Sequence, residues 1–258
     1  MTEQVRELGA RWLRFIEHVG AVLVLTQRTL VAVFTSRFEL RLFVYQMEQL
    51  GVKSLGIAAA TSIFIGIVMA IQFAFSLERF GARDTVGRIV ALAEVRELAP
   101  SLTALVVGSR IGAGMAAELG SMKVTEQIDA IRALGADPIK KLVVPRLLAG
   151  LVVMPLLTCF ALVLGVFSAM IVSKLSFGVS MTFFLSSAVD TVGIMDLASG
   201  LGKTPVFGFL IAMLGCYFGL STDGGTEGVG RSTTAAVVVV SIGVLMADAV
   251  LTQLFLGL

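Results

Sequence analysis

Charged residues are scarce in this 258-residue sequence, at 15% against about 25% in a typical soluble domain. One histidine and two cysteines are too few for a zinc cluster or a disulfide framework, and five prolines with no polar low-complexity tract exclude intrinsic disorder. A net charge of +2 gives no reason to expect nucleic-acid binding. Apolar residues instead make up 57% of the chain, and mean hydropathy is +0.94. The composition therefore indicates an integral membrane protein rather than a water-soluble globule.

Long apolar runs predict an all-α fold with about five transmembrane helices, because a helix needs roughly 20 mostly apolar residues to cross the hydrocarbon. Four of these runs carry at most one charged residue, whereas the second carries several, among them Arg88, Glu94, Arg96 and Glu97. The predicted spans cover residues 54–77, 86–119, 147–173, 197–220 and 233–257.

Residues 1–50 have another pattern and are predicted to form an interfacial amphipathic segment. Apolar residues at three- and four-residue intervals share one helical face, and arginines alternate with them. The apolar face comprises Val5, Leu8, Trp12, Phe15, Ile16 and Val19. A basic amphipathic helix of this kind is typical of the membrane surface, although a soluble helical cap is an alternative. No compact apolar core with a small-residue cleavage site follows the early charges, so we do not expect a signal peptide.

Basic residues near the span ends predict the orientation of the chain. They are dense in the N-terminal segment and again between Lys123 and Arg146. An even number of predicted spans separates these two regions, so both can lie on the cytoplasmic side. We therefore expect the N-terminus inside and the C-terminus outside.

A short cytoplasmic helix is predicted at residues 123–134, between spans two and three. Ser121 is its expected N-cap, and Gly135 and the Asp137-Pro138 pair end it. An apolar stripe is expected to face the bundle and a charged side to remain free; the stripe comprises Val124, Ile128, Ile131 and Leu134. The helix is either an ordinary surface element or a docking element that receives force from a soluble partner.

Ionisable residues inside predicted spans need a reason, since each costs at least about 2.5 kcal/mol at membrane depth. Glu94 and Glu97 share a helix face, and Pro100 is expected to free the carbonyl of Arg96. Arg96 and Glu97 either pair locally near the outer interface, or face a cavity and meet a lipid headgroup or another span. Lys203 is then a natural partner for Glu97. Buried Asp248 must pair, bond to hydroxyls or stay protonated.

Two further helix faces, one apolar and one made of small residues, can be explained either by packing alone or by a function. The apolar side chains of span one could line a cavity for acyl chains or could only pack and contact lipid; they are Phe64, Ile67, Val68, Ile71 and Phe75. Gly108, Gly112, Ala116 and Gly120 recur every four residues, a spacing that allows close helix packing. Arg110 and Glu118, eight apart in the same span, are expected to align and to brace the bundle.

Motifs of soluble enzymes are missing or out of context. The G-x-G-x-x-A pattern that begins at Gly112 lies in a membrane helix, and the P-loop-like stretch Gly225 to Ser232 has Arg231 in place of lysine. The latter is predicted to be a turn, with Thr226 or Ser232 capping span five. There is no H-E-x-x-H or G-x-S-x-G, so we expect no catalytic residues, no metal site and no enzymatic activity in this chain.

Three stretches together resemble the MlaE/YrbE family of ABC-transporter permeases. They are FIGIVMAIQ from Phe64, EGVGRSTTAAVVVVS from Glu227, and RELAPSLTALVVGSRIGAGMAAELGSMKVTEQIDAIRALGADPIKKLVVPRLLAG from Arg96. The resemblance covers most of the chain from about residue 45, which places an MlaE-type permease domain at residues 51–258.

The resemblance implies a homodimer in the bacterial inner membrane that moves phospholipid between that membrane and the periplasm, as in lipid-asymmetry maintenance. It implies an MlaF-type cytoplasmic ATPase that binds ATP and Mg²⁺, so that this chain needs no cofactor. An MlaB-type STAS-domain protein and an MlaD-type MCE-domain protein are further implied partners.

The resemblance also assigns roles to residues. Arg96, Glu97 and Lys203, with the apolar stripe of span one, would line the lipid cavity. Glu126, Asp129 and Arg132 on the helix after span two would contact the ATPase. The alternative is a proton-coupled secondary transporter of an amphipathic substrate, with Glu94, Glu97 or Asp248 as its proton relay.

Overall fold

The computed structural model describes residues 2–35, 39–82 and 85–256, with side chains from Leu13 onward except at positions 14, 15 and 256. All regular elements in these ranges are helices, which confirms the all-α fold class. They are α1 (Thr2–Thr35), α2 (Leu40–Leu50), η1 (Val52–Ser54), α3 (Leu55–Glu78), α4 (Val86–Ala93), η3 (Glu94–Leu102), α5 (Thr103–Val124), α6 (Gln127–Ala133), η4 (Ile139–Val143), α7 (Val144–Phe177), α8 (Met181–Thr191), α9 (Ile194–Leu220) and α10 (Gly225–Leu256).

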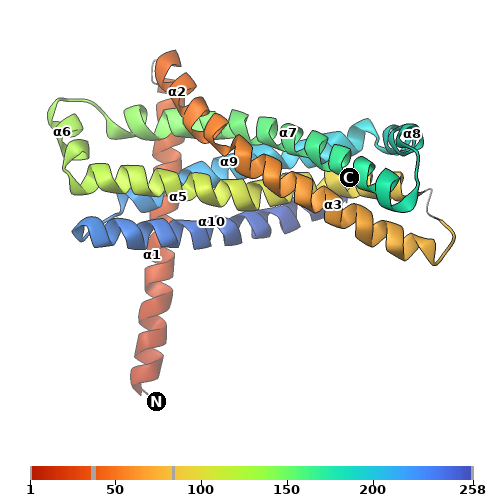
Figure 1. Cartoon of the computed structure of the whole chain (residues 1–258). Coiled ribbons are helices and arrows are strands. Elements are labelled where there is room, and N and C mark those ends of the chain that lie inside the picture. Colours follow the sequence, from red (N-terminus) through yellow and green to blue (C-terminus); the bar gives the residue numbers. More distant parts are fainter. Residues whose placement is uncertain (1, 36–38, 83–84, 257–258) are drawn as a thin grey trace.

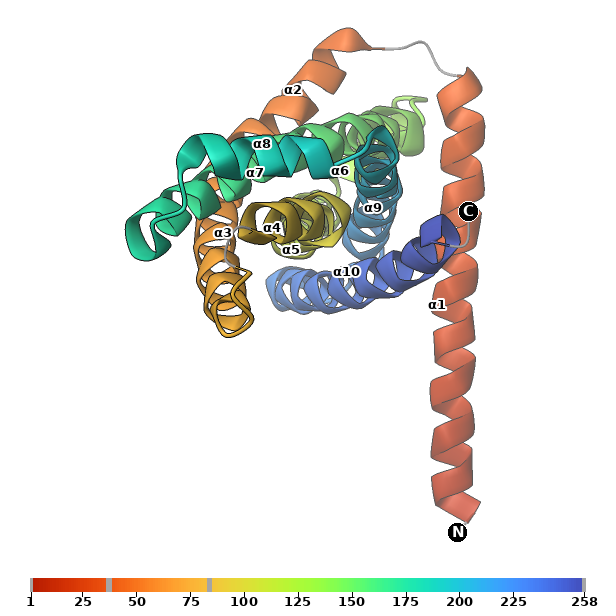
Figure 2. The same ribbon diagram turned by 90° about the vertical axis from the view of Figure 1, so that its right-hand side faces the viewer.

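Five long helices, α3, α5, α7, α9 and α10, lie side by side in one bundle (Figures 1 and 2). Helix α5 packs against α9 and α10, while α3 packs mainly against α7. The predicted small-residue stripe of α5 makes the close contacts: a Cβ at Gly112 would lie 2.9 Å from Val240 of α10, and the carbonyl of Gly112 approaches Gly215 of α9. The expectation of close packing along this stripe is therefore confirmed.

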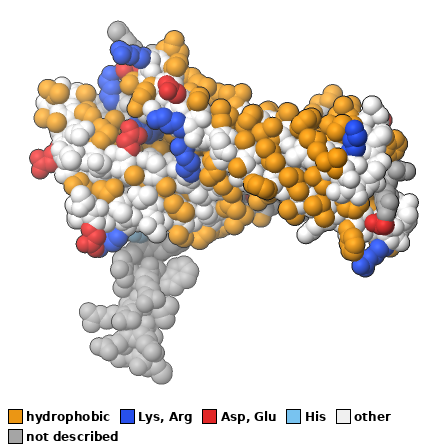
Figure 3. All heavy atoms as spheres, in the orientation of Figure 1, with side chains coloured by type: hydrophobic (Ala, Val, Ile, Leu, Met, Phe, Trp, Pro, Cys, Tyr) orange, Lys and Arg blue, Asp and Glu red, His pale blue; other side chains and the backbone are white. Residues whose placement is uncertain are grey.

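A broad apolar surface covers the middle of the bundle, and charged side chains gather mainly at the end that carries α2 and α6 (Figure 3). A surface of this kind marks a region that contacts lipid. Among the described residues, five segments are long and apolar enough to cross a membrane: Ile16–Thr35, Leu40–Glu78, Ile139–Phe177, Ile194–Leu220 and Gly225–Phe255. Three of them contain the predicted spans one, three and four, and Gly225–Phe255 covers all but the last two residues of predicted span five.

The charged second span is absent from that set, yet it lies at the centre of the bundle. Helices α4, η3 and α5 follow one another without a break from Val86 to Val124. Its ionisable residues lower the hydropathy of the sequence, but several of them are paired inside the protein, as described below.

Helix α1 runs across the bundle instead of along it (Figures 1 and 2). It contacts η4, α9 and α7, and His18 Nδ1 lies 2.6 Å from the hydroxyl of Tyr217 on α9. A helix transverse to the spans lies in the membrane plane, which favours the predicted interfacial position, although Ile16–Thr35 is long enough to span. The position of α1 stays a prediction, since the side chains of Val5, Leu8, Trp12 and Phe15 lie outside the described residues.

Two predicted helix boundaries are wrong, and one helix was not predicted. Lys123 and Val124 belong to α5, which continues through Ser121, so the short cytoplasmic helix is only α6 and Ser121 is not its N-cap. Helix α10 begins at Gly225, eight residues before the predicted start, so the predicted turn from Gly225 to Ser232 is helical and neither Thr226 nor Ser232 caps the span. Helix α8 was not predicted; Ser180 caps it by accepting a hydrogen bond from the Phe183 N–H, at 3.1 Å.

Candidate functional site

A π-helical segment brings the charged part of the second span against α9. Segment η3 contains Pro100, which has no N–H to donate, and the carbonyl of Arg96 instead accepts a hydrogen bond from Lys203 Nζ at 3.3 Å. Helix α9 comes close enough for this contact because it carries Gly200 there: a Cβ at that position would lie 2.0 Å from the Val95 carbonyl oxygen. The Arg96 carbonyl, which Pro100 was expected to free, therefore has a side-chain donor on α9.

Lys203 is the centre of a polar cluster that joins η3, α9 and α10. Its side chain is buried, and Nζ donates to Glu97 at 2.8 and 2.9 Å, to Asp248 Oδ1 at 3.2 Å and to Thr252 Oγ1 at 2.6 Å. Asp248 also accepts a hydrogen bond from Ser101 Oγ at 2.7 Å. A desolvated ammonium needs such partners, because an unpaired charge at membrane depth is strongly unfavourable. The expected pairing of Lys203 with Glu97 is present, and Asp248, expected to find a partner, is part of the same cluster.

Arg96 extends the cluster towards the start of α9. Its Nε donates to Asp196 Oδ1 at 2.6 Å, and Asp196 also accepts the Gly193 N–H at 2.8 Å. Of the two alternatives for Arg96, the structure therefore contains the pair with another helix and not the local pair with Glu97. Two cations and three carboxylates meet here.

The cluster forms the wall of a small pocket of about 70 Å³ near the end of the bundle opposite α6. Its lining comprises Arg96, Glu97, Met195, Asp196, Ser199, Lys203, Thr252 and Phe255. The side chains of Arg96 and Glu97 are 43% and 42% exposed, whereas Lys203 is buried behind them. A guanidinium and a carboxylate that both reach the exterior can bind a phosphate and an ammonium, respectively.

The apolar stripe of α3 lies elsewhere. Small residues bury the opposite face of α3 against α7; they are Ala58, Ser62, Gly66, Ala70 and Ala74. Of the predicted stripe, Ile67 is partly buried, while Phe64, Val68, Ile71 and Phe75 are exposed. None of the five lines the polar pocket, so one copy of the chain does not bring the stripe and the charged residues into a single cavity.

Helix α6 presents its charged residues outward, as predicted. Ile128 is fully buried and fixes α6 to the bundle, and Asp129 pairs with Arg132 at 2.9 Å and with Lys123 at 3.7 Å. Glu126 precedes the helix in a left-handed conformation, with φ of 59°. One expected member of the apolar stripe is wrong: Leu134 is 86% exposed, because α6 ends at Ala133 before the chain turns away at Gly135.

A second buried cation, Arg146, was missed as a structural residue. Its guanidinium donates to the Leu142 carbonyl at 2.6 Å and pairs with Glu118 Oε2 at 2.8 Å, which ties the start of α7 to the end of α5. Arg110 donates to Ser54 Oγ at 2.6 Å, so Arg110 and Glu118 each link α5 to another helix, as expected of residues that brace the bundle. The sequence shows Arg146 as one of several basic residues in a loop, with no sign of its burial.

Glu94 is buried apart from the polar pocket. It is 2% exposed, its carboxyl lies against Gly165 of α7, and Oε1 has no hydrogen-bond partner among the described residues. Among these residues there is also no group of three or more His, Cys, Asp or Glu side chains arranged to hold a metal ion.

Comparison with known proteins gives a consistent result. Residues 43–254 match the family described as "Permease MlaE". The chain is 38% identical to the Arabidopsis thaliana chloroplast protein named TRIGALACTOSYLDIACYLGLYCEROL 1, over 91% of this chain and 67% of that protein. It is 37% identical to a probable ABC transporter permease protein of Rickettsia felis, over 96% of each chain. It is 38% identical to a probable ABC transporter permease protein of Synechocystis sp., over 93% of this chain and 91% of that protein. The chain therefore belongs to the MlaE family of ABC-transporter permeases.

Proposed function

We propose that this chain is the membrane-spanning subunit of an ABC transporter that moves phospholipids between the bacterial inner membrane and the periplasm. The observation that carries the proposal is the pocket in which the half-exposed Arg96 and Glu97 are held by the buried Lys203. Charged groups at membrane depth are expensive and are retained where they serve a transport path. The name of the Arabidopsis relative, which contains that of a glycerolipid, supports a lipid substrate.

In this proposal Arg96 binds the phosphate of the headgroup, and Glu97 accepts a hydrogen bond from its ammonium or hydroxyl group. Asp196 and Lys203 would keep these two side chains in place between substrates, because Arg96 donates to Asp196 and Glu97 accepts from Lys203. The acyl chains would contact the exposed α3 stripe, namely Phe64, Val68, Ile71 and Phe75, with Ile67 behind it. Since the stripe and the pocket are separate in one chain, a shared cavity requires a second copy, so we propose a homodimer.

Energy would come from a partner ATPase of the MlaF type that docks on α6. The exposed Glu126, Asp129 and Arg132 offer a charged surface for it, and buried Ile128 would pass the movement of α6 to the bundle. Partners of the MlaB and MlaD types complete the proposed assembly, on the ATPase and on the periplasmic side. ATP and Mg²⁺ would be bound by the ATPase alone.

The test is transport in proteoliposomes that contain the full chain and its ATPase. Labelled phospholipid should move only with hydrolysable ATP, and a protonophore should leave the rate unchanged. Transport that a protonophore stops and that ATP depletion does not would overturn the proposal in favour of proton coupling. Glu126→Lys with Asp129→Lys should uncouple ATP hydrolysis from transport, whereas Glu227→Lys, at an exposed acidic residue on α10, is the control.

A further inference from the structure

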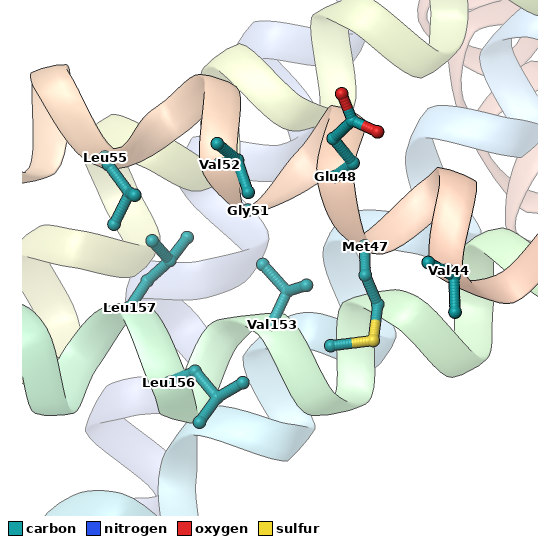
Figure 4. A pocket seen from close by; sticks show the side chains of 9 residues that line it. All are labelled: Val44, Met47, Glu48, Gly51, Val52, Leu55, Val153, Leu156 and Leu157. Carbon is teal, nitrogen blue, oxygen red and sulfur yellow. The ribbon is translucent and has the colours of Figure 1, made fainter.

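A second pocket lies at the other end of the bundle, where α2 turns into α3 beside α7 (Figure 4). We call it the elbow pocket; its volume is about 370 Å³. Its lining is apolar except for one carboxylate, and comprises Val44, Met47, Glu48, Gly51, Val52, Leu55, Val153, Leu156 and Leu157. It shares no residue with the polar pocket around Lys203.

The turn between α2 and α3 builds this pocket into the fold. Gly51 closes the turn against α7: a Cβ there would lie 2.7 Å from the Met47 carbonyl and 3.4 Å from Val153. Ser54 holds the next turn by donating to the Leu50 carbonyl at 2.5 Å, and Arg110 of α5 donates to the same hydroxyl. The hollow therefore results from fixed backbone geometry.

The position of the pocket decides what can fill it. Val153 to Leu157 follow Leu147, where the predicted third span begins, by six to ten residues, or about 9–15 Å along the helix, so we expect this wall inside the hydrocarbon region. Several lining side chains are exposed, with Val52 at 61% and Leu156 at 57%, so the pocket opens to the outside of the bundle. Water needs two to four polar partners to occupy a cavity, and the wall supplies one carboxylate. An acyl chain is the molecule that matches this wall at this depth.

Charged residues of both signs occur in the chain segment that forms the pocket. The Glu48 carboxylate turns away from the apolar side chains (Figure 4), and the exposed Lys53 follows Val52 and donates to Gln49 Oε1 at 2.5 Å. The carboxylate of Glu48 in the lining, and the ammonium of the residue that follows Val52, have the two charges that complement a zwitterionic headgroup. We propose that the elbow pocket binds one acyl chain of a bilayer phospholipid from the leaflet on the α6 side, and that Glu48 selects a headgroup with an ammonium group. The proposal depends on membrane insertion and not on transport.

Tryptophan fluorescence in vesicles tests this site in the full chain. The sequence contains one tryptophan, so Trp12→Phe gives a silent background. Val52→Trp places a reporter at the rim, with Val44→Trp as a second, independent one. Val163→Trp is the matched control, because Val163 is on the same helix α7 as the pocket wall, 66% exposed and outside the pocket. The quenchers are phosphatidylethanolamine and phosphatidylglycerol brominated on their acyl chains.

Both rim reporters should be quenched more by the ethanolamine lipid than by the glycerol lipid, by about two- to fivefold in relative affinity, as expected of a partly exposed ion pair. The control should not discriminate, and Glu48→Gln should remove the preference. Equal quenching by both lipids at the rim would overturn the headgroup selection. A rim reporter that neither lipid quenches would overturn the site and indicate that a second copy of the chain or another protein covers it. Either failure leaves ATP-driven transport untouched, so the two proposals can fail separately.

Discussion

Two buried cations hold opposite ends of the bundle, and their surroundings differ. Lys203, near the start of α9, has two carboxylates and a hydroxyl around its ammonium. Arg146, near the start of α7, has one carboxylate and one backbone carbonyl, and its Nε has no partner among the described residues. At the Lys203 end an exposed group can therefore exchange its partner for a ligand while the buried cation remains satisfied. At the Arg146 end the same exchange would leave the cation unpaired, so this contact suits mechanical linkage rather than binding.

Removal of Lys203 should have the largest effect on stability. Lys203→Met leaves the mostly buried Asp248 beside the half-exposed Glu97 with no ammonium between them, and breaking a buried ion pair costs about 3–5 kcal/mol. We expect a large fall in the free energy of unfolding of the detergent-solubilised chain, measured by denaturant titration. Lys174→Met, at an exposed lysine near the end of α7, is the control and should change nothing.

If unpaired charge is the cause of the instability of Lys203→Met, two further substitutions should restore its stability. Adding Glu97→Gln and Asp248→Asn to Lys203→Met removes the uncompensated charges and should restore most of the lost stability, because neutral groups tolerate burial better than unpaired ions. A triple variant no more stable than Lys203→Met would show that the cost comes from lost packing and not from charge.

Gly200→Ala should cause the second-largest loss of stability, again at the Lys203 end of the bundle. The new Cβ would meet the Val95 carbonyl at 2.0 Å, and both atoms belong to rigid helical backbone. Overpacking of this kind costs about 1–3 kcal/mol. Gly202→Ala is a matched control on the same helix, since its Cβ would make an ordinary contact with Phe255 at 3.4 Å. Equal unfolding free energies for the two variants would mean that α9 shifts freely against η3.

The sequence predicts the positions of the membrane helices better than it predicts the side-chain contacts between them. Apolar runs locate α3, α7, α9 and α10, because long uncharged segments are themselves the signal for a span. Pro100 predicts an irregular hydrogen-bond pattern at this point of the second span, and the structure has a π-helical segment there, since the effect of a missing N–H is local in the chain. The partners of Arg96 and Asp248 lie on other helices, and no local pattern specifies which carboxylate or hydroxyl will be near.

The ends of α5 and α10 were also predicted wrongly, because tertiary contacts decide them as well. The stop and start signals around Ser121 and Ser232 are weak beside the tertiary contacts that extend α5 and α10. Arg146 is similar: a basic residue just before an apolar run resembles an interfacial charge, and only the approach of α5 turns it into a buried partner of Glu118. Residues that act across helices are therefore the ones for which a structure is needed.

Glu118→Gln tests the Arg146 end and should cost less than the loss of Lys203. Hydrogen bonds to charged groups contribute about 1.5–3 kcal/mol, and the amide oxygen of Gln can keep one of them, so we expect a loss of about 1–2 kcal/mol. Transport per ATP hydrolysed should fall as well, because the two helices that flank α6 are less firmly joined. Arg146→Met should cost less stability than Glu118→Leu, since the half-exposed Glu118 stays hydrated while Arg146 would be left buried and unpaired. A larger loss of stability for Arg146→Met than for Glu118→Leu would mean that Arg146 contributes more than its pair with Glu118.

Arg96→Ala should have the smallest effect on stability and a clear effect on transport. Its pair with Asp196 is partly exposed, and such pairs contribute less than about 1 kcal/mol. If Arg96 binds the phosphate of the lipid, loss of one charge-assisted hydrogen bond should lower the rate at subsaturating lipid about tenfold. Arg88→Ala, at an exposed arginine on α4 outside the pocket, should leave the rate unchanged. Two results would contradict this view. One is a fall in the unfolding free energy of Arg96→Ala as large as that of Lys203→Met, and the other is equal transport rates for Arg96→Ala and Arg88→Ala. Either would mean that the Lys203 end does not differ from the Arg146 end in binding lipid.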